Sequence, residues 1–364
     1  MFSFDPTEEQ KMLVEVIKRY SSQDLRAGAH DADEEGNLLP AMIEKGWELG
    51  YLQASIPEEY EGYGERSAIT GALAAEEMAW GDLAGALAVF SPGLFAIPIL
   101  LVGSEAQKRE FLPQIIEADW QPYTSALIEP AFDFDPNEVH TAAYTDNGSF
   151  VIKGEKICVP YAAEAEALIV YAQLEGKTQG FIVPRRIEGI QVGERQKLLG
   201  INAMPVYRVC FNEMRVPKEN LLGGPQGHDF APILASFRIA LASMAIGLSR
   251  AALEYSRDYA KDRDVFGVKA AQKQAIAFMI AEMATEIEAI RLLTWEAAWM
   301  LDSGKAEASK HAYLALVGAT DMAMMVTDRA VQILGGHGYI REHPVELWMR
   351  NGRGIAAING LAII

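Results

Sequence analysis

Hydrophobic and polar residues change their spacing twice along the chain, which divides it into three stretches. In the first stretch apolar residues recur at helical spacing, as Leu13, Ile17 and Tyr20 do after the polar segment Thr7–Gln10. A threonine followed three residues later by a glutamine can bond backbone amides in both directions, so this segment predicts a capped helix start. We expect residues 1–120 to form an N-terminal α-helical domain.

The middle stretch has the pattern of β-strands. Short runs rich in β-branched and aromatic residues, such as SFVIKG and VYRVCF, are separated by turn-forming residues such as Asp146-Asn147-Gly148. This pattern predicts a small β-barrel or β-sandwich domain over residues 121–228.

Long helices return in the third stretch. Apolar residues between Ile276 and Ile290 recur at alternating intervals of four and three, close to a heptad repeat. A second long helix is expected from about Ala306 to Leu334. Two such helices suit a C-terminal four-helix bundle over residues 229–364, so the predicted fold class is α+β with three domains.

Composition narrows the function classes. The 364 residues are 50% hydrophobic, which is enough for more than one folding unit, and the net charge is −18. An acidic surface argues against nucleic acid or an anionic membrane as a partner. The two cysteines, Cys158 and Cys210, lie in strand-like runs and are expected to be reduced. The N-terminus has no signal-peptide pattern, so a cytoplasmic location is expected.

Several common site motifs are missing from the sequence. No G-x-G-x-x-G follows a strand, no Cys/His cluster has metal spacing, and no G-x-S-x-G is present. His337 and His343 flank a loop and are interpreted as surface or hydrogen-bonded histidines. The segment Gln332–Gly338 (QILGGHG) ends a helix with three glycines. Such a corner turns sharply and admits close approach of a flat or phosphorylated group.

The sequence resembles the acyl-CoA dehydrogenase family of flavoproteins over nearly its whole length. The segments that carry the resemblance are QILGGHGYIREHPVE, RDVFG (263–267) and QKQAIAFMIAEM (272–283). The resemblance implies FAD bound between neighbouring subunits, with Arg263 on its pyrophosphate, because a planar guanidinium matches phosphate oxygens. The glycine corner would receive the adenosine part. The positions carried over for cofactor binding are Arg263, Phe266, Gln274, Gln332, Gly335 and Gly336.

The middle domain departs from the family pattern. The family loop T-E-P-G-A-G-S-D corresponds to residues 128–135, where Ile128 and Phe134 replace its threonine and serine. The family strand W-I-T is Cys158-Val159-Pro160, and proline has no N–H to give a flavin ring. Several polar flavin contacts are therefore missing. The residues that remain are Glu129, Pro130 and Asp135, and structural roles are expected for them.

The substrate positions depart as well. Arg238 matches a family arginine that faces acyl-CoA, whereas an aspartate three residues earlier is Ala235. The family's catalytic glutamate corresponds to Asn359, and an alternative glutamate position corresponds to Phe237. An amide does not titrate near neutral pH and cannot act as a base. If the base lies elsewhere, Asp133 is the first candidate.

Three functions are compatible with these residues. The first is an FAD-dependent acyl-CoA dehydrogenase with a non-standard or altered base position, which passes electrons to an electron-transfer flavoprotein. The second is a base-lacking subunit of a heteromeric α2β2 acyl-CoA dehydrogenase, whose sister chain supplies the base and part of the FAD site. The third is non-oxidative elimination or desulfination of an acyl-CoA. A tetramer, homomeric or α2β2, is expected in each case.

Overall fold

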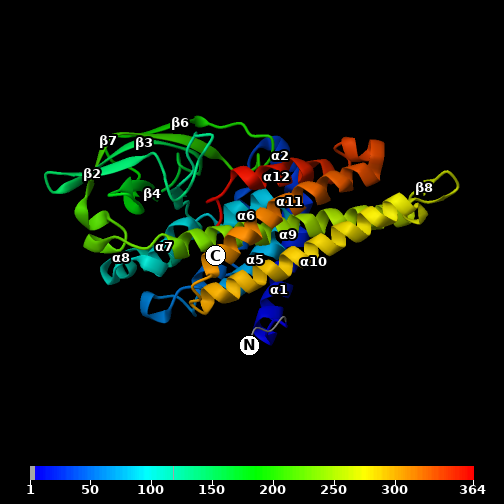
Figure 1. The fold of residues 1–364 in the computed structure, drawn as a ribbon, viewed down its shortest axis with the longest axis horizontal. Coiled ribbons are helices and arrows are strands. Elements are labelled where there is room, and N and C mark those ends of the chain that lie inside the picture. Colours follow the sequence, from blue (N-terminus) through cyan, green and yellow to red (C-terminus); the bar gives the residue numbers. More distant parts are fainter. Residues whose placement is uncertain (1–4, 118) are drawn as a thin grey trace.

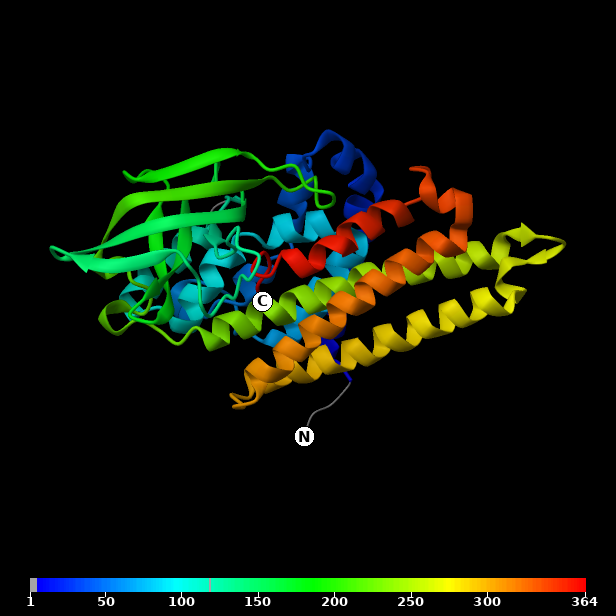
Figure 2. The same ribbon diagram turned by 45° about the horizontal axis from the view of Figure 1, so that its top comes forward.

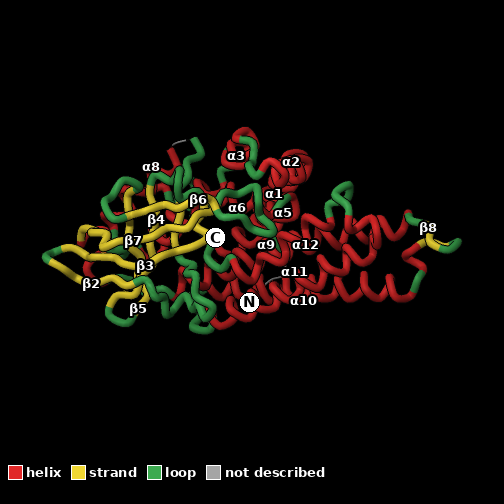
Figure 3. The backbone as a smooth tube through the Cα atoms, turned by 90° about the horizontal axis from the view of Figure 1, so that it is seen from above, coloured by secondary structure: helices red, strands yellow, loops and turns green. Residues whose placement is uncertain are grey.

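The computed structural model describes residues 5–117 and 119–364 and consists of three parts (Figure 1). A β domain lies at one end of a long helical bundle, and most of the helical N-terminal part lies along the side of the bundle (Figures 1 and 3). The predicted fold class is therefore confirmed. The domain boundaries at residues 120 and 228 stay predictions. The prediction about a signal peptide concerns the N-terminus, whose residues 1–4 lie outside the described residues.

The N-terminal part is built from short helices. The first, α1 (Glu8–Tyr20), begins with the predicted capping box, in which the Thr7 and Gln10 side chains each bond the other's backbone amide. The helices that follow are α2 (Arg26–Glu35), α3 (Pro40–Trp47), α4 (Tyr51–Ala54), α5 (Ala68–Gly81), α6 (Leu83–Phe90), α7 (Gly93–Val102) and α8 (Glu105–Glu117).

The apolar helix α7 contains a proline, Pro98, in its interior. A proline within a helix removes one backbone hydrogen bond. Residues 93–99 are all buried, so packing of this apolar helix outweighs the local cost of the proline.

The middle part is one seven-stranded sheet in the order β1-β4-β2-β3-β7-β6, with β5 paired to β4. Asn147 and Gly148, both with positive φ, make the predicted turn between β2 and β3. The strands are β1 (Thr124–Ala126), β2 (Ala142–Asp146), β3 (Ser149–Pro160), β4 (Ala167–Leu174), β5 (Lys177–Pro184), β6 (Ile190–Arg195) and β7 (Val206–Pro217).

The C-terminal part is a bundle around α9 (Ala231–Asp262), with α10 (Gln274–Asp302), α11 (Ala308–Leu334) and α12 (Val345–Gly354) (Figure 2). α9 is long and apolar enough to cross a membrane, but 83% of its most apolar window is buried inside the protein. This burial is typical of the central helix of a bundle. The hairpin of β8 (Asp264–Val265) and β9 (Val268–Lys269) lies at the tip of the bundle, away from the β domain (Figure 1).

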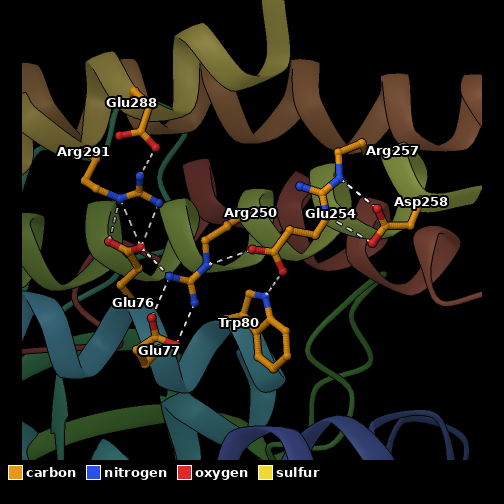
Figure 4. Close-up of polar contacts among 9 residues, drawn as sticks. All are labelled: Glu76, Glu77, Trp80, Arg250, Glu254, Arg257, Asp258, Glu288 and Arg291. Atoms are coloured by element: carbon orange, nitrogen blue, oxygen red, sulfur yellow. Dashed lines mark hydrogen bonds and ion pairs between the residues drawn. The ribbon is translucent and has the colours of Figure 1, made fainter. Parts of the chain in front are cut away.

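A network of buried charges joins the N-terminal part to the bundle (Figure 4). Glu76 of α5 accepts hydrogen bonds from Arg250 of α9 and Arg291 of α10. Its neighbour Glu77 receives both terminal nitrogens of Arg250, at 2.6 and 2.7 Å. The network lines a groove of about 600 Å³ between α1, α5, α9 and α10. Its positive and negative groups are paired with one another, so we interpret it as a structural clamp.

Candidate functional site

The glycine corner and Arg263 line one pocket at the tip of the bundle. α11 ends at Leu334, and Gly335, with a φ of 61°, turns the chain into a short 3₁₀ segment. A pocket of about 360 Å³ lies there, and its lining includes Arg263, Lys273, Gly335 and Gly336. A Cβ at either glycine would meet nothing within 4 Å, so both stand beside open space.

The pocket contains two cations without anionic partners. Neither Arg263 nor Lys273 forms an ion pair within the described part of the chain. The acidic neighbours of Arg263 do not pair with it: Lys269 bonds the Asp264 carboxylate, and Asp262 forms no ion pair with Arg263 in the described chain. In a protein with a net charge of −18, two unpaired cations beside a glycine turn suit an anionic ligand such as a diphosphate.

The other predicted cofactor residues are exposed and do not line this pocket, although each is next to a residue that does. Phe266 is 94% exposed, and Gln274 and Gln332 are exposed as well. All of them lie at the tip of the bundle, whereas the β domain lies at the other end (Figures 1 and 3). A ligand shared by the tip and a β domain must therefore bridge two chains.

Two of the β-domain positions that correspond to flavin contacts are buried among apolar residues. Ile128 and Cys158 are 6% and 8% exposed and belong to one apolar cluster with Ile201 and Met204. Phe134 is half-buried and packs against the same cluster. The Ile157 amide donates to the Ile128 oxygen at 2.8 Å, which holds the loop against β3.

The polar groups of this segment are also occupied or missing. The amide of Cys158 donates to the Gln196 side chain at 2.7 Å, and Pro160 has no N–H. The tip pocket therefore has cations that suit a diphosphate such as that of FAD, whereas at the family's flavin positions Ile128 and Pro160 carry no polar side chain and the Cys158 amide is already bonded.

Glu129 and Lys156 form a buried structural pair beside this segment. The Lys156 Nζ lies 2.8 Å from Glu129 Oε1, and Glu129 also accepts the amides of His140 and Thr141. Burial would raise the pKa of Glu129, but Lys156 and the hydrogen bonds outweigh it and lower the pKa overall. This geometry fits the structural role expected for Glu129.

Asn359 lies where the three parts of the chain meet. Its side chain is half-buried, and its Oδ1 atom is buried without a hydrogen-bond partner in the described chain. Gly360, with a φ of 109°, packs against Leu127 at the end of β1. Residues 361–364 are buried, and the Ile364 oxygen accepts bonds from Arg66 of the N-terminal part. Asn359 therefore presents an unused acceptor in a closed environment.

None of the other positions predicted to bind substrate or act as a base places a carboxylate beside Asn359. Phe237 is fully buried, with its ring 6.1 Å from that of Tyr171, and Asp133 is exposed. Arg238 is half-buried, lies 5.0 Å from the Tyr313 ring, and has a buried Nε atom without a partner. Burial lowers the pKa of Arg238, opposed by Asp135.

Two pocket residues were missed in the sequence. Tyr259 lies one helical turn before Arg263 on α9, and Lys273 immediately precedes α10; both line the pocket. The four-residue spacing of Tyr259 and Arg263 on one helix could have indicated the first. His337 and His343 are hydrogen-bonded, as interpreted, to the hydroxyls of Tyr259 and Tyr255. Within residues 5–117 and 119–364, no group of His, Cys, Asp and Glu has metal-binding geometry.

Comparison with known proteins identifies the family. Sequence models of the N-terminal, middle and C-terminal domains of acyl-CoA dehydrogenase match residues 7–119, 124–214 and 231–361. The mitochondrial short-chain specific acyl-CoA dehydrogenase of Sus scrofa is 34% identical over 361 residues, which is 96% of this chain and 86% of that protein.

Solved structures agree. Butyryl-CoA dehydrogenase from Megasphaera elsdenii superposes with a TM-score of 0.89 at 30% identity, covering 99% of this chain and 96% of that one. A chain from a structure of the electron transferring flavoprotein of Acidaminococcus fermentans gives 0.89 at 31% identity, with the same coverage. The chain therefore belongs to the acyl-CoA dehydrogenase family of FAD-dependent enzymes and is an oxidoreductase acting on acyl-CoA, alone or as one subunit of a complex.

Proposed function

We propose that this chain is the base-lacking subunit of a heteromeric acyl-CoA dehydrogenase. Its bundle tip would hold the diphosphate and adenosine of an FAD whose ring lies on the β domain of a sister chain. One contrast carries this proposal. The tip pocket is open and holds unpaired Arg263 and Lys273, whereas Ile128 and Cys158 of the β domain are packed in an apolar cluster.

The position of Asn359 supports the same assignment. Dehydrogenation of an acyl-CoA requires a base for the α proton, donors for the thioester oxygen, and a hydride acceptor, which FAD supplies when bound. An asparagine can bond a substrate but cannot take its proton. In the proposed complex the carboxylate comes from the sister chain, whose ring site is completed by Arg263 and Phe266 of this chain.

Exposed apolar side chains on the bundle support association between chains. Phe278 and Leu292 of α10 are 58% and 40% exposed, and Tyr313, Leu314 and Val317 of α11 are also exposed. Large apolar side chains gathered on two neighbouring helices mark a protein–protein surface. We expect a tetramer, α2β2 with the sister chain.

The substrate and electron acceptor follow from the relatives. The Sus scrofa protein is specific for short acyl chains and the Megasphaera elsdenii protein acts on butyryl-CoA, so we propose a short-chain acyl-CoA as substrate. The superposed chain from the structure of an electron transferring flavoprotein supports such a flavoprotein as the electron acceptor.

The test is cofactor content with and without a sister chain. The chain would be purified alone and after co-expression with a homologue that carries glutamate at the position of Asn359, and FAD would be quantified by absorbance. We expect little FAD alone, about one FAD per pair of chains in the complex, and bleaching by butyryl-CoA only in the complex. One FAD per chain in the isolated protein, bleached rapidly by butyryl-CoA, would exclude the proposal.

A second candidate is a self-sufficient homotetramer. The observation in its favour is the buried, unpartnered Oδ1 atom of Asn359, which can accept a hydrogen bond from a bound substrate. Such a chain would hold acyl-CoA without rapid α-proton removal. Desulfination of a sulfinate-bearing acyl-CoA, in which the C–S bond breaks and the carbon takes up a proton, needs no such removal and would be the reaction to assay. Binding of acyl-CoA to the isolated, FAD-loaded chain would favour it.

A further inference from the structure

Two histidines form a stacked pair beside the tip pocket. The rings of His337 and His343 are nearly parallel, with an interplanar angle of 17° and centroids 5.3 Å apart. His337 lines the pocket together with Arg263 and Lys273, whereas His343 does not. The pair therefore places one imidazole at the ligand position and the second behind it.

A tyrosine hydroxyl fixes each ring through one nitrogen. The Tyr259 hydroxyl lies 2.7 Å from His337 Nδ1, and the Tyr255 hydroxyl lies 2.7 Å from His343 Nδ1. If the hydroxyl donates, Nδ1 is unprotonated and Nε2 carries the proton; if the ring is cationic, both nitrogens are donors. If a neutral ring instead donates Nδ1–H to the hydroxyl oxygen, Nε2 is unprotonated and becomes a donor only when the ring takes up a proton. Nε2 of His337 has no protein partner in the described chain, so it is available to a ligand.

The positive charges near the pair oppose protonation of a neutral histidine to its cationic form unless an anion is also bound. Tyr255 and Tyr259 on α9 bond the pair, and the charged groups that line the pocket with His337 are Arg263 at the end of α9 and Lys273 before α10. On the α12 side the neutral Trp348 contacts Tyr255. Neither histidine forms an ion pair with a carboxylate within residues 5–117 and 119–364. Protonating His337 thus adds a third positive charge to the pocket, which a bound diphosphate would compensate.

We propose that His337 is a third cationic contact for the diphosphate and that binding at the tip takes up a proton. This inference rests on the proposed function, because it assumes that the tip pocket holds a diphosphate. Histidine is the residue type that changes charge near neutral pH, so affinity at the tip falls as the pH rises through that range.

The experiment is calorimetric titration of the assembled protein with ADP-ribose. This probe carries the adenosine and the diphosphate of FAD without the flavin ring, and its diphosphate stays ionised throughout the range tested. Titrations at pH 7 in two buffers of different ionisation enthalpy give the number of protons taken up. We expect uptake of a fraction of a proton, and an affinity that falls roughly tenfold between pH 6 and pH 8.

Variants separate this inference from the proposed function. In His337→Asn we expect no proton uptake and less than about a twofold change in affinity over the same range. Arg263→Ala should bind ADP-ribose weakly at every pH. If Arg263→Ala weakens binding but the unchanged protein takes up no proton, only the role of His337 is wrong. If Arg263→Ala binds as tightly as the unchanged protein, the tip pocket is not the diphosphate site and both proposals fail.

Discussion

Arg263 at the end of α9 and Gly335 at the end of α11 line the same pocket. Because Arg263 has no anionic partner in the described chain, Arg263→Ala should remove a charge-assisted contact to the cofactor without exposing a buried carboxylate. We expect a loss of about 2–3 kcal/mol, or roughly 30- to 150-fold in the Kd for FAD. Arg257→Ala is the matched control, since Arg257 lies on the same helix and pairs with Asp258. Equal FAD affinity in both variants would contradict the assignment.

Some of these structural features could be predicted from the sequence, and others could not. Helical spacing, strand patterns and turn residues predicted the three-part fold, because each follows from local hydrogen bonding and burial. Motif resemblance then located the glycine corner and Arg263. The burial of Ile128 and Cys158 could not be predicted, since it depends on Ile201 and Met204 packing over them from a distant loop.

The same limit applies to two other features. The contacts of Arg66 with the Ile364 oxygen join opposite ends of the chain, and no local pattern encodes them. The helix through Pro98 likewise depends on the packing around it.

The clamp between α5 and the bundle gives a stability prediction (Figure 4). The side chain of Glu76 is 5% exposed and accepts hydrogen bonds from two arginines. Glu76→Gln removes the negative charge that Arg250 and Arg291 share in this buried position. We expect a loss of about 3–5 kcal/mol in the free energy of unfolding. Glu288 also bonds Arg291 but is 62% exposed, so Glu288→Gln should cost less than about 1 kcal/mol. Urea denaturation of both variants measures the difference, and similar losses would show that burial of the clamp is unimportant.

The buried pair of Glu129 and Lys156 should make the protein sensitive to acid. The pKa of Glu129 is lower in the folded chain than its ordinary value of 4.5, so the unfolded chain binds more protons in the window below pH 4.5. The contribution of this pair is present above that window and is lost as the pH falls through it. In Lys156→Met the pKa of Glu129 should rise towards or above its unfolded value, so the loss of stability on acidification that this carboxyl causes should shrink or reverse. Thermal melts from pH 7 to pH 3 test this, and identical acid profiles would contradict it.

The apolar surface of α10 and α11 should mediate assembly. Leu314 and Val317 are both 44% exposed and lie one turn apart on α11, so a double change to glutamate places two charges on the proposed interface. We expect the assembly to dissociate towards the 39.9 kDa chain while the helical content stays unchanged. Sedimentation velocity and circular dichroism measure these properties. Met12→Glu on α1 is the control, since Met12 is exposed on another part of the molecule.

Asn359 provides the most direct test of the chemistry. An amide at the base position permits substrate binding but cannot remove the α proton, and general-base catalysis contributes roughly 10²–10⁴-fold. The unchanged chain should therefore reduce its flavin slowly or not at all. Asn359→Glu should raise the rate by a comparable factor wherever FAD is bound, and Asn359→Asp should gain less because its carboxylate is one methylene shorter.

The measurement for Asn359 is anaerobic mixing with butyryl-CoA while flavin bleaching is followed in all three forms. Equal rates for the asparagine and glutamate forms would mean that residue 359 is not the base position, and Asp133 would be tested next. If no form bleaches although FAD is present, the fault lies with the ring site, where Ile128, Cys158 and Pro160 supply no polar contact. In that case bleaching should appear only when a sister chain with its own glutamate is added, and its rate should be the same with each residue at position 359.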